Sequence, residues 1–183
     1  MIFREVDDRD LVLRARKGGV DAYNALVSRW EKRLFNYLLR FTGNSEDALD
    51  LCQDAFLKAY QSLARLEDPA RFGGWLFRIA HNEAISAIRR SKPEVSIEDQ
   101  PPESGRRTAP GMAPVEVSLA VESALAKLSS DQREAVLLKV YQGFKFEEIA
   151  EILGCPPSTV KSRVYTGLEL LKEMLSPAGA PRG

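Results

Sequence analysis

Small polar and basic side chains gather at the start of a helix near the end of the chain. Four of them stand within two turns: Ser158, Lys161, Ser162 and Arg163. Such groups hydrogen-bond to base edges and to phosphates. Residues 145–153 before them have apolar side chains at helical spacing, and Gly154 can end that helix in the left-handed conformation. Two helices across a tight turn predict a helix-turn-helix, with an ordinary helical hairpin as the alternative.

A second group combines a flat aromatic ring, an amide and several guanidinium groups on one face of a helix. Its members are Trp75, Arg78, Asn82 and Arg89, with Arg90 beside them. Aromatic rings stack on unpaired bases, amides bond to base edges, and guanidinium groups hold phosphates. The loop before this helix adds Arg71 and Phe72. The alternative interpretation is a half-buried core tryptophan flanked by solvated arginines.

A third group is acidic. Asp47, Asp50 and Asp54 form a stripe along a predicted helix, and Leu51 and Gln53 lie next to it. Carboxylates beside an exposed leucine are suited to docking on a basic helix of a partner. The alternative is a solvated face in which Asp54 pairs with Lys58 one turn later.

No residue pattern indicates catalysis, a metal or a cofactor. His81 is the only histidine, and no serine or carboxylate stands in a recognisable partnership with it. Gly73 and Gly74 open a helix and are not part of a phosphate-binding loop. Cys52 and Cys155 form no CxxC motif, so neither a zinc site nor a disulfide framework is indicated, and a redox role for either thiol stays open.

Composition narrows the class of protein. The 183 residues carry a formal net charge of zero, which excludes a polybasic nucleic-acid coat. Residues 1–92 carry 16 basic and 13 acidic side chains, residues 93–116 carry two and five, and residues 117–183 carry eight of each. This distribution suggests several different contact surfaces. The N-terminus has no apolar signal region and no segment reaches membrane-spanning length, so we expect a cytoplasmic protein.

Helical periodicity predicts four helices in the first half of the chain. They cover about residues 10–17, 23–41, 45–63 and 74–90, with a loop over 65–72. In the third helix we expect a buried stripe of five residues: Leu49, Cys52, Phe56, Ala59 and Leu63. In the fourth, an apolar stripe separate from the aromatic-basic face is predicted at Leu76, Ile79, Ala80 and Ala84.

The second half begins after a stretch of linker composition. Residues 91–114 hold five prolines and two glycines, and the helical period returns at Val117. Ser129 and Gln132 can form a capping box, and Val140 is placed among the apolar positions of the helix that follows. The last helix should bury Val160, Val164, Leu168 and Leu171.

The fold prediction is therefore all-α, with two small helical domains joined by a flexible acidic linker. The predicted boundaries are a first domain over 1–92, the linker over 93–116, a second domain over 117–175 and a disordered tail over 176–183. No strand pattern competes with these helices.

Three motifs in this order resemble one family. They are DALDLCQDAF at residues 47–56, FGGWLFRIAHN at 72–82, and FEEIA to TVKSR within 146–163. Together they resemble bacterial sigma factors of the extracytoplasmic-function group, and the likeness covers nearly the whole chain outside the linker and tail. It implies a non-enzymatic subunit with sigma regions 2 and 4 that binds core RNA polymerase and directs it to promoters.

The resemblance also implies roles for the three groups. The third helix would dock on the polymerase clamp helices through Asp47, Asp50, Leu51, Gln53, Asp54 and Phe56, while region 4 meets the flap. The −10 element would be melted and captured by Arg71, Phe72, Trp75, Arg78, Asn82, Arg89 and Arg90. The −35 element would be contacted by Ser158, Lys161, Ser162, Arg163, Tyr165 and Thr166, with Arg163 as a phosphate contact or a structural support. An anti-sigma factor is a further implied partner, and the free protein would be a monomer.

One departure from the family pattern affects the −35 group. Thr166-Gly167 stands where the family often has a basic residue followed by Arg-Ala. Glycine costs a helix about 1 kcal/mol relative to alanine, so this helix either frays or packs closely at that point. The departure leaves the −35 sequence preference open.

Two other functions remain as alternatives. A sigma mimic would sequester an anti-sigma factor without using DNA, and the aromatic-basic face and Lys161 argue against it. A conventional helix-turn-helix regulator would bind duplex DNA alone, which leaves the first domain without a function.

Overall fold

A computed structural model of the chain describes the backbone of residues 5–91 and 115–177. Side chains are described for residues 5–91 and 119–177. The helices and short helical turns are α1 (Asp8–Arg16), α2 (Val20–Thr42), α3 (Ser45–Ser62), η1 (Leu63–Arg65), η2 (Pro69–Arg71), α4 (Phe72–Ser91), α5 (Val115–Ala126), α6 (Ser130–Val136), η3 (Leu137–Tyr141), α7 (Phe146–Leu153) and α8 (Pro157–Leu175). No strand occurs within these ranges, so the all-α prediction is confirmed.

The chain divides into two compact units, Met1–Arg106 and Arg107–Gly183. We call the unit that contains α1 to α4 the front unit and the one that contains α5 to α8 the rear unit. Most of the predicted linker and most of the predicted tail lie outside the described residues, so their character and the exact domain boundaries stay predictions.

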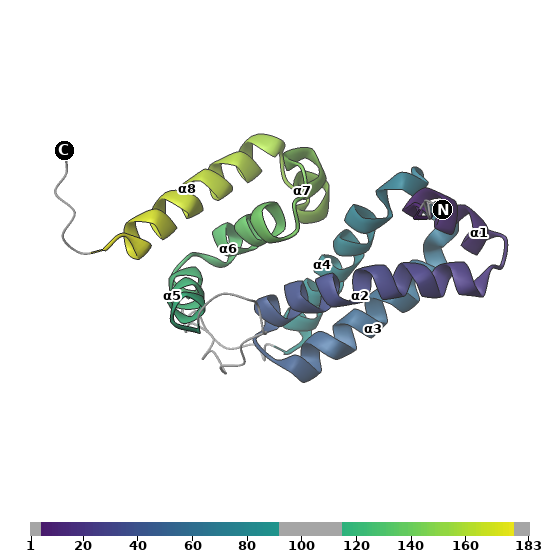
Figure 1. The fold of residues 1–183 in the computed structure, drawn as a ribbon, viewed down its shortest axis with the longest axis horizontal. Coiled ribbons are helices and arrows are strands. Elements are labelled where there is room, and N and C mark those ends of the chain that lie inside the picture. The colour runs from purple at the N-terminus through teal and green to yellow at the C-terminus, as the bar shows by residue number, and fades with distance from the viewer. Residues whose placement is uncertain (1–4, 92–114, 178–183) are drawn as a thin grey trace. The chain divides into compact units, whose positions relative to one another are not determined.

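In the front unit, α2, α3 and α4 pack on one another and α1 packs at the end where α2 begins (Figure 1). Local chemistry sets the helix boundaries. Gly43 ends α2 in the left-handed conformation with φ of 70°, and the Asn44 side chain then caps α3 by accepting from the amides of Glu46 and Asp47. The largest fully buried side chains here include Tyr37, Phe72 and Phe77, and each such group contributes roughly 1.5–3 kcal/mol through burial.

In the rear unit, α8 packs against α5, α6 and α7. The predicted capping box at the start of α6 is present: the amide of Gln132 donates to Ser129 Oγ over 3.2 Å, and the amide of Ser129 donates to Gln132 Oε1 over 3.3 Å. After α6 the helix widens to a π turn in η3, where the amide of Gln142 donates to the carbonyl of Leu137. Gly143, with φ of 73°, then turns the chain toward α7.

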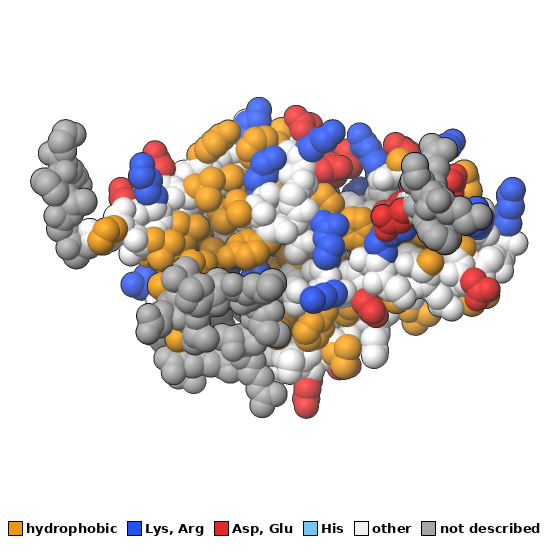
Figure 2. Space-filling model, in the orientation of Figure 1, with side chains coloured by type: hydrophobic (Ala, Val, Ile, Leu, Met, Phe, Trp, Pro, Cys, Tyr) orange, Lys and Arg blue, Asp and Glu red, His pale blue; other side chains and the backbone are white. Residues whose placement is uncertain are grey.

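Several predicted buried positions are wrong. Leu49 is 50% exposed and Val140 is 56% exposed, so neither belongs to a core. Leu168 is also exposed, and it lies with Leu170, Met174 and Leu175 on a helix whose second half is only partly covered. Figure 2 shows hydrophobic side chains at the surface of the rear unit, in the area that α6 and α8 occupy in Figure 1. Apolar spacing identifies a helix, but it cannot say how far the neighbouring helices extend along it.

Candidate nucleic-acid interface

The aromatic-basic residues of the front unit lie on the side of α4 that faces away from its core. Leu76, Phe77, Ala80 and Ala84 are buried, whereas Arg78, Asn82, Arg89 and Arg90 are exposed and Trp75 is half-buried. Arg71 precedes the helix in η2, where its guanidinium lies 3.8 Å from the carboxylate of Asp68. The helical period therefore presents a ring, an amide and cations along one line of α4, as predicted.

Phe72 is the exception in this group. The sequence places it in an exposed loop, but α4 begins at Phe72 and its side chain is fully buried. Its ring centroid lies 6.1 Å from that of Trp75. Phe72 is thus a core anchor beneath Trp75, because the residues before it form a 3-10 turn that leads directly into the helix.

His81 lies among the buried residues of α4, with its ring edge-on to Phe41 at 6.2 Å between centroids. His81 is therefore a packing side chain of the front unit. On the other flank of α4, Glu83 forms an ion pair with Lys58 of α3. Lys58 is therefore directed toward α4 and is not the partner of Asp54 that the solvated-face interpretation assumed.

The helix-turn-helix of the rear unit consists of α7, a turn at Gly154 and α8. Gly154 has φ of 67°, and the amide of Cys155 donates to the carbonyl of Ala150 over 3.2 Å. Val160 and Val164 are buried against the unit's core. The opposite side of α8 presents five exposed members of the predicted −35 group: Ser158, Lys161, Ser162, Tyr165 and Thr166.

Arg163 does not share that open face. Its Nη2 lies 3.2 Å from the carboxylate of Asp131 at the start of α6, and its Nη1 donates to the Cys155 sulfur over 3.7 Å. The side chain is 28% exposed. Of the two roles that the sequence left open for Arg163, this geometry favours structural support, since the guanidinium ties α8 to α6 and to the turn.

Two residues without a predicted role in DNA binding, Lys139 and Phe146, lie against the −35 group. Lys139 Nζ lies 4.4 Å from the centroid of the Phe146 ring, and Lys161 Nζ lies 5.7 Å from the same centroid. The ring centroids of Phe146 and Tyr165 are 5.9 Å apart. Lys139 also donates to the carbonyl of Phe144 over 3.2 Å. A cation over an aromatic face is attracted to it by about 0.5–1 kcal/mol at an exposed site, so Phe146 favours the observed positions of Lys139 and Lys161. No sequence signal identifies this cluster, because Lys139 comes from a different helix.

The acidic stripe on α3 is exposed, but its predicted apolar members are not. Asp47, Asp50, Gln53 and Asp54 are open to solvent, whereas Leu51 and Phe56 are each 8% exposed and belong to the core. Leu51 is therefore wrong as a surface residue. Phe56 is buried as the stripe prediction for this helix expects, which contradicts only its implied place on the polymerase surface. The large hydrophobic side chains exposed on α3 are Leu49, Leu57 and Tyr60. Of the buried stripe predicted for this helix, Cys52, Phe56, Ala59 and Leu63 are buried, and only Leu49 is wrong. Leu51 is buried as well because the packed face of α3 is wider than one apolar period predicts.

The two thiols differ in their surroundings. Cys52 is buried and lies 4.0 Å from the carbonyl of Glu31, and burial raises the pKa of its thiol to about 11. A thiol with such a pKa is almost entirely protonated near neutral pH and reacts slowly. Cys155 is partly exposed, in the turn of the helix-turn-helix. The described residues hold no cluster of His, Cys, Asp and Glu side chains suited to a metal ion.

Comparison with known proteins agrees with this geometry. A family model described as sigma-70 region 2 matches residues 26–94, and one described as sigma-70, region 4 matches residues 118–171. The RNA polymerase sigma-H factor of Pseudomonas aeruginosa is 31% identical, and the alignment covers 93% of this chain and 94% of that protein. The SigW factor of Bacillus subtilis strain 168, an extracytoplasmic-function sigma factor, is 30% identical, and the alignment covers 90% of this chain and 94% of that protein. The chain belongs to the sigma-70 family, in its extracytoplasmic-function group. The front unit thus carries sigma region 2 and the rear unit sigma region 4.

Other sigma factors are similarly close. The extracytoplasmic-function sigma-E factor of Escherichia coli strain K12 is 32% identical, with 94% of this chain and 96% of that protein covered. Among solved structures, the sigma factor RpoE in complex with the anti-sigma factor NepR from Bartonella quintana has a TM-score of 0.71 and 28% identity, covering 87% of this chain and all of that one. CnrH in complex with the cytosolic domain of CnrY has a TM-score of 0.70, also at 28% identity, with 94% and 99% covered.

Membership in this family makes the protein a promoter-directing factor of transcription initiation. Proteins of this kind are in general DNA-binding subunits and not enzymes. Among the described helices, none combines the length and apolar character needed to cross a bilayer.

Proposed function

We propose that this sigma factor binds core RNA polymerase through α3, reads −35 duplex DNA with α8, and captures the melted −10 strand on α4. The observation that carries the proposal is the exposed line of α4, which displays Trp75, Arg78 and Asn82 opposite a fully buried face. A protein that only bound duplex DNA would have no use for a ring and an amide on a second domain. In this account the protein acts in the cytoplasm and contributes no catalytic residue.

The energetics of melting favour a strand-capturing helix, α4, in addition to the duplex-reading helix α8. Opening a few base pairs costs several kcal/mol, since stacking is worth about 1.4 kcal/mol per step. Stacking of a flipped base on an aromatic side chain returns about 1–3 kcal/mol per base. Trp75 is half-buried, so its orientation is fixed while part of its ring stays accessible. Single-strand capture on α4 can therefore offset much of the melting cost once polymerase holds the DNA.

On duplex DNA, α8 would lie in the major groove. Lys161 and Ser162 can reach bases or phosphates, and Tyr165, which is 59% exposed, can pack on a thymine methyl or on the backbone. Ser158 and Thr166 flank them on the same exposed side. Arg163 is assigned to supporting the helix, because of its contacts with Asp131 and Cys155.

The polymerase surface follows from what α3 leaves exposed. We assign it to Asp47, Asp50, Gln53 and Asp54, with the exposed Leu49 and Leu57 in place of the buried Leu51 and Phe56. Acidic groups around exposed leucines suit a basic amphipathic partner helix. An anti-sigma factor as a second partner is supported by the likeness to a sigma factor solved with one, at 28% identity.

Replacing Asn82 by alanine tests the capture role. We expect open-complex formation to fall by about tenfold, the value of one well-placed amide contact to a base. Binding of region 4 to −35 duplex DNA should stay unchanged, because Asn82 lies in the other unit. Permanganate reactivity of the −10 segment measures the first quantity and a gel shift with −35 duplex the second. Asn24→Ala, at an exposed amide on α2, is the matched control; an equal loss in both assays would count against strand capture.

Replacing Asp54 by alanine tests the polymerase surface. We expect the affinity for core polymerase to fall severalfold, and to fall less in high salt, because a rim charge acts mainly through long-range attraction. A fluorescence binding titration with labelled core polymerase gives both values. Asp21→Ala removes an exposed aspartate from α2 and serves as the control. Equal affinities of the two variants for core polymerase would show that the acidic stripe is a solvated face and not a docking surface.

A further inference from the structure

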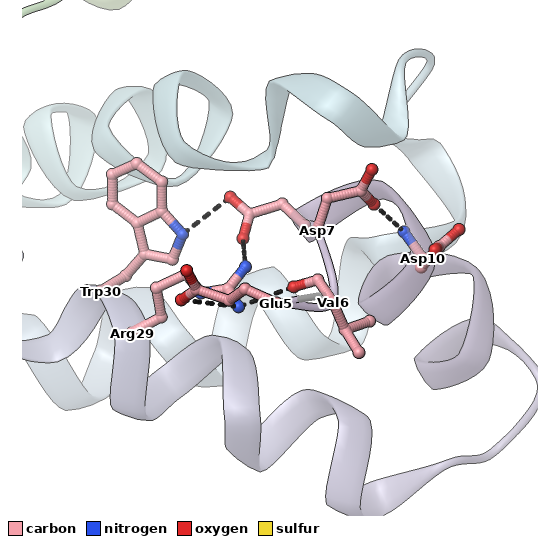
Figure 3. Close-up of polar contacts among 7 residues, drawn as sticks. Glu5, Val6, Asp7, Asp10, Arg29 and Trp30 are labelled. Atoms are coloured by element: carbon pink, nitrogen blue, oxygen red, sulfur yellow. Dashed lines mark hydrogen bonds and ion pairs between the residues drawn. The ribbon is translucent and has the colours of Figure 1, made fainter. Parts of the chain in front are cut away.

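The first helix precedes the stretch matched as region 2, yet its N-terminal end is tied to α2. Asp8 Oδ1 accepts from Arg29 Nη1 over 2.6 Å, and Asp8 Oδ2 accepts from the Trp30 indole nitrogen over 3.0 Å (Figure 3). The carbonyl of Val6 accepts from Arg29 Nη2 over 2.7 Å. The Asp8 side chain is only 17% exposed. A carboxylate held by two donors in a partly buried place is a strong attachment.

Trp30 connects Asp8 to the start of α4, because its ring contacts both. The six-membered part of its indole lies against Gly73, so closely that a Cβ there would stand 2.2 Å from the nearest ring carbon. The ring is edge-on to Phe77 at 6.2 Å between centroids, and the guanidinium of Arg33 lies 4.3 Å from the ring centroid. One end of the indole is therefore bonded to Asp8 while the other contacts the second residue of α4.

The C-terminal end of α1 is tied to the connection between α3 and α4. Arg16 Nε donates to the carbonyl of Leu63 over 3.1 Å, and Arg16 Nη2 donates to the carbonyl of Leu66. These carbonyls belong to η1 and to the residue after it. α1 also packs against η2 and α4. Both ends of α1 are thus connected by hydrogen bonds and packing to the backbone before or at the start of α4, where the exposed line of aromatic and basic residues begins.

We propose that residues 5–16 form a brace that fixes the start of α4, with Asp8 and Arg16 as positioning residues that do not touch DNA. The proposal rests on the proposed −10 capture by α4. The exposed line at Arg71, Trp75 and Arg78 begins where the brace attaches, so its geometry depends on the first turn of the helix. Loosening that turn lowers the fraction of molecules competent to capture a strand, and the apparent affinity falls by the same factor.

The test uses holoenzyme reconstituted from the full chain and Escherichia coli core polymerase. The probe is a single-stranded oligonucleotide that covers the non-template −10 segment of a promoter selected by the wild-type holoenzyme from a genomic library. Asp8→Ala and Arg16→Met remove the two attachments. Asp10→Ala and Arg14→Met change the same charges at exposed positions in the same first and last turns of α1.

We expect Asp8→Ala and Arg16→Met each to weaken capture of the oligonucleotide by about tenfold relative to their controls. Core affinity, which depends on α3, should match that of the controls, and amide hydrogen exchange should quicken in the first turn of α4 and not in α3. Trp30→Phe keeps a ring but removes the indole donor, and it should weaken capture in the same direction.

Two results would overturn the brace alone: capture equal to that of the controls, or a parallel fall of capture and core affinity, which indicates general unfolding. A wild-type holoenzyme that captures no strand overturns the proposed function and the brace with it.

Discussion

Gly73→Ala should lower the free energy of unfolding of the front unit by about 2 kcal/mol. The new methyl carbon would stand 2.2, 2.4 and 2.8 Å from three carbons of the Trp30 ring. Overpacking of this kind costs about 3 kcal/mol at the upper end, and the gain in helix propensity returns about 1 kcal/mol. The ring cannot move aside freely, because Asp8 binds its nitrogen and Phe77 lies against it. Urea denaturation followed by circular dichroism measures the change.

The adjacent glycine is the matched control. A Cβ at Gly74 meets nothing within 4 Å, so Gly74→Ala should stabilise the same helix by about 0.5–1 kcal/mol. Changes of opposite sign in the free energy of unfolding at these two neighbouring glycines would support the close contact between Gly73 and Trp30. Adding Trp30→Phe to Gly73→Ala should show a coupling energy of about 1 kcal/mol, since the smaller ring makes room. Simple additivity of the two changes would contradict the packing described here.

In the rear unit, Gly167→Leu should have a larger effect and unfold region 4 while region 2 stays folded. A Cβ at Gly167 would stand 2.8 Å from Val136 Cγ2 and 3.6 Å from Leu128 Cδ1, both in the unit's core. A domain of this size has a stability of only about 3–5 kcal/mol, and overpacking by a whole leucine removes about 3 kcal/mol or more. The thermal unfolding transition that belongs to region 4 should disappear, together with binding to −35 duplex DNA.

Glu169→Leu introduces the same side chain at an exposed position of α8 and should leave that unfolding transition in place. A milder pair gives a second test. Gly167→Ala should be destabilising by about 1 kcal/mol, and Val136→Ala in the same chain should reduce that loss by providing space. If Gly167→Leu and Glu169→Leu unfold alike, the close approach of α8 to α6 does not limit the stability of the unit. Core polymerase affinity, measured alongside, reports that region 2 is intact.

Much of the fold could be read from local chemistry. Thr42-Gly43 is typical of a helix end, Asn44 or Ser45 can cap the helix that follows, and Ser129 and Gln132 predict a capping box. Gly43 ends α2, Asn44 caps α3, and the capping box is present. These signals succeed because each acts within a few residues and depends little on the rest of the chain. The same holds for the −10 group on α4, since residues three, four and seven apart share one face of any helix.

Prediction failed where an answer depended on which neighbour covers a helix. Leu49 and Leu51 are chemically alike and two residues apart, yet one is 50% exposed and the other 8%. Phe72 was assigned to a surface but fills the core, and Phe56 was given both a buried position and a docking role, of which the structure has the buried position. An apolar side chain supports either a core or a docking surface, and only the packing partner distinguishes them.

The sequence by itself determined the helices, several of their ends, the division into two helical domains and the family. It also placed Lys161, Ser162 and Tyr165 on one face of the last helix, because helical spacing is a local property. Only the tertiary structure decided that Gly167 packs closely and does not mark a frayed end, since the deciding contact is with Val136, 31 positions earlier in the chain. It likewise decided that Arg163 turns to Asp131 and that Trp30 joins Asp8 to Gly73. Contacts between distant residues depend on how whole helices pack, and no local spacing carries that information.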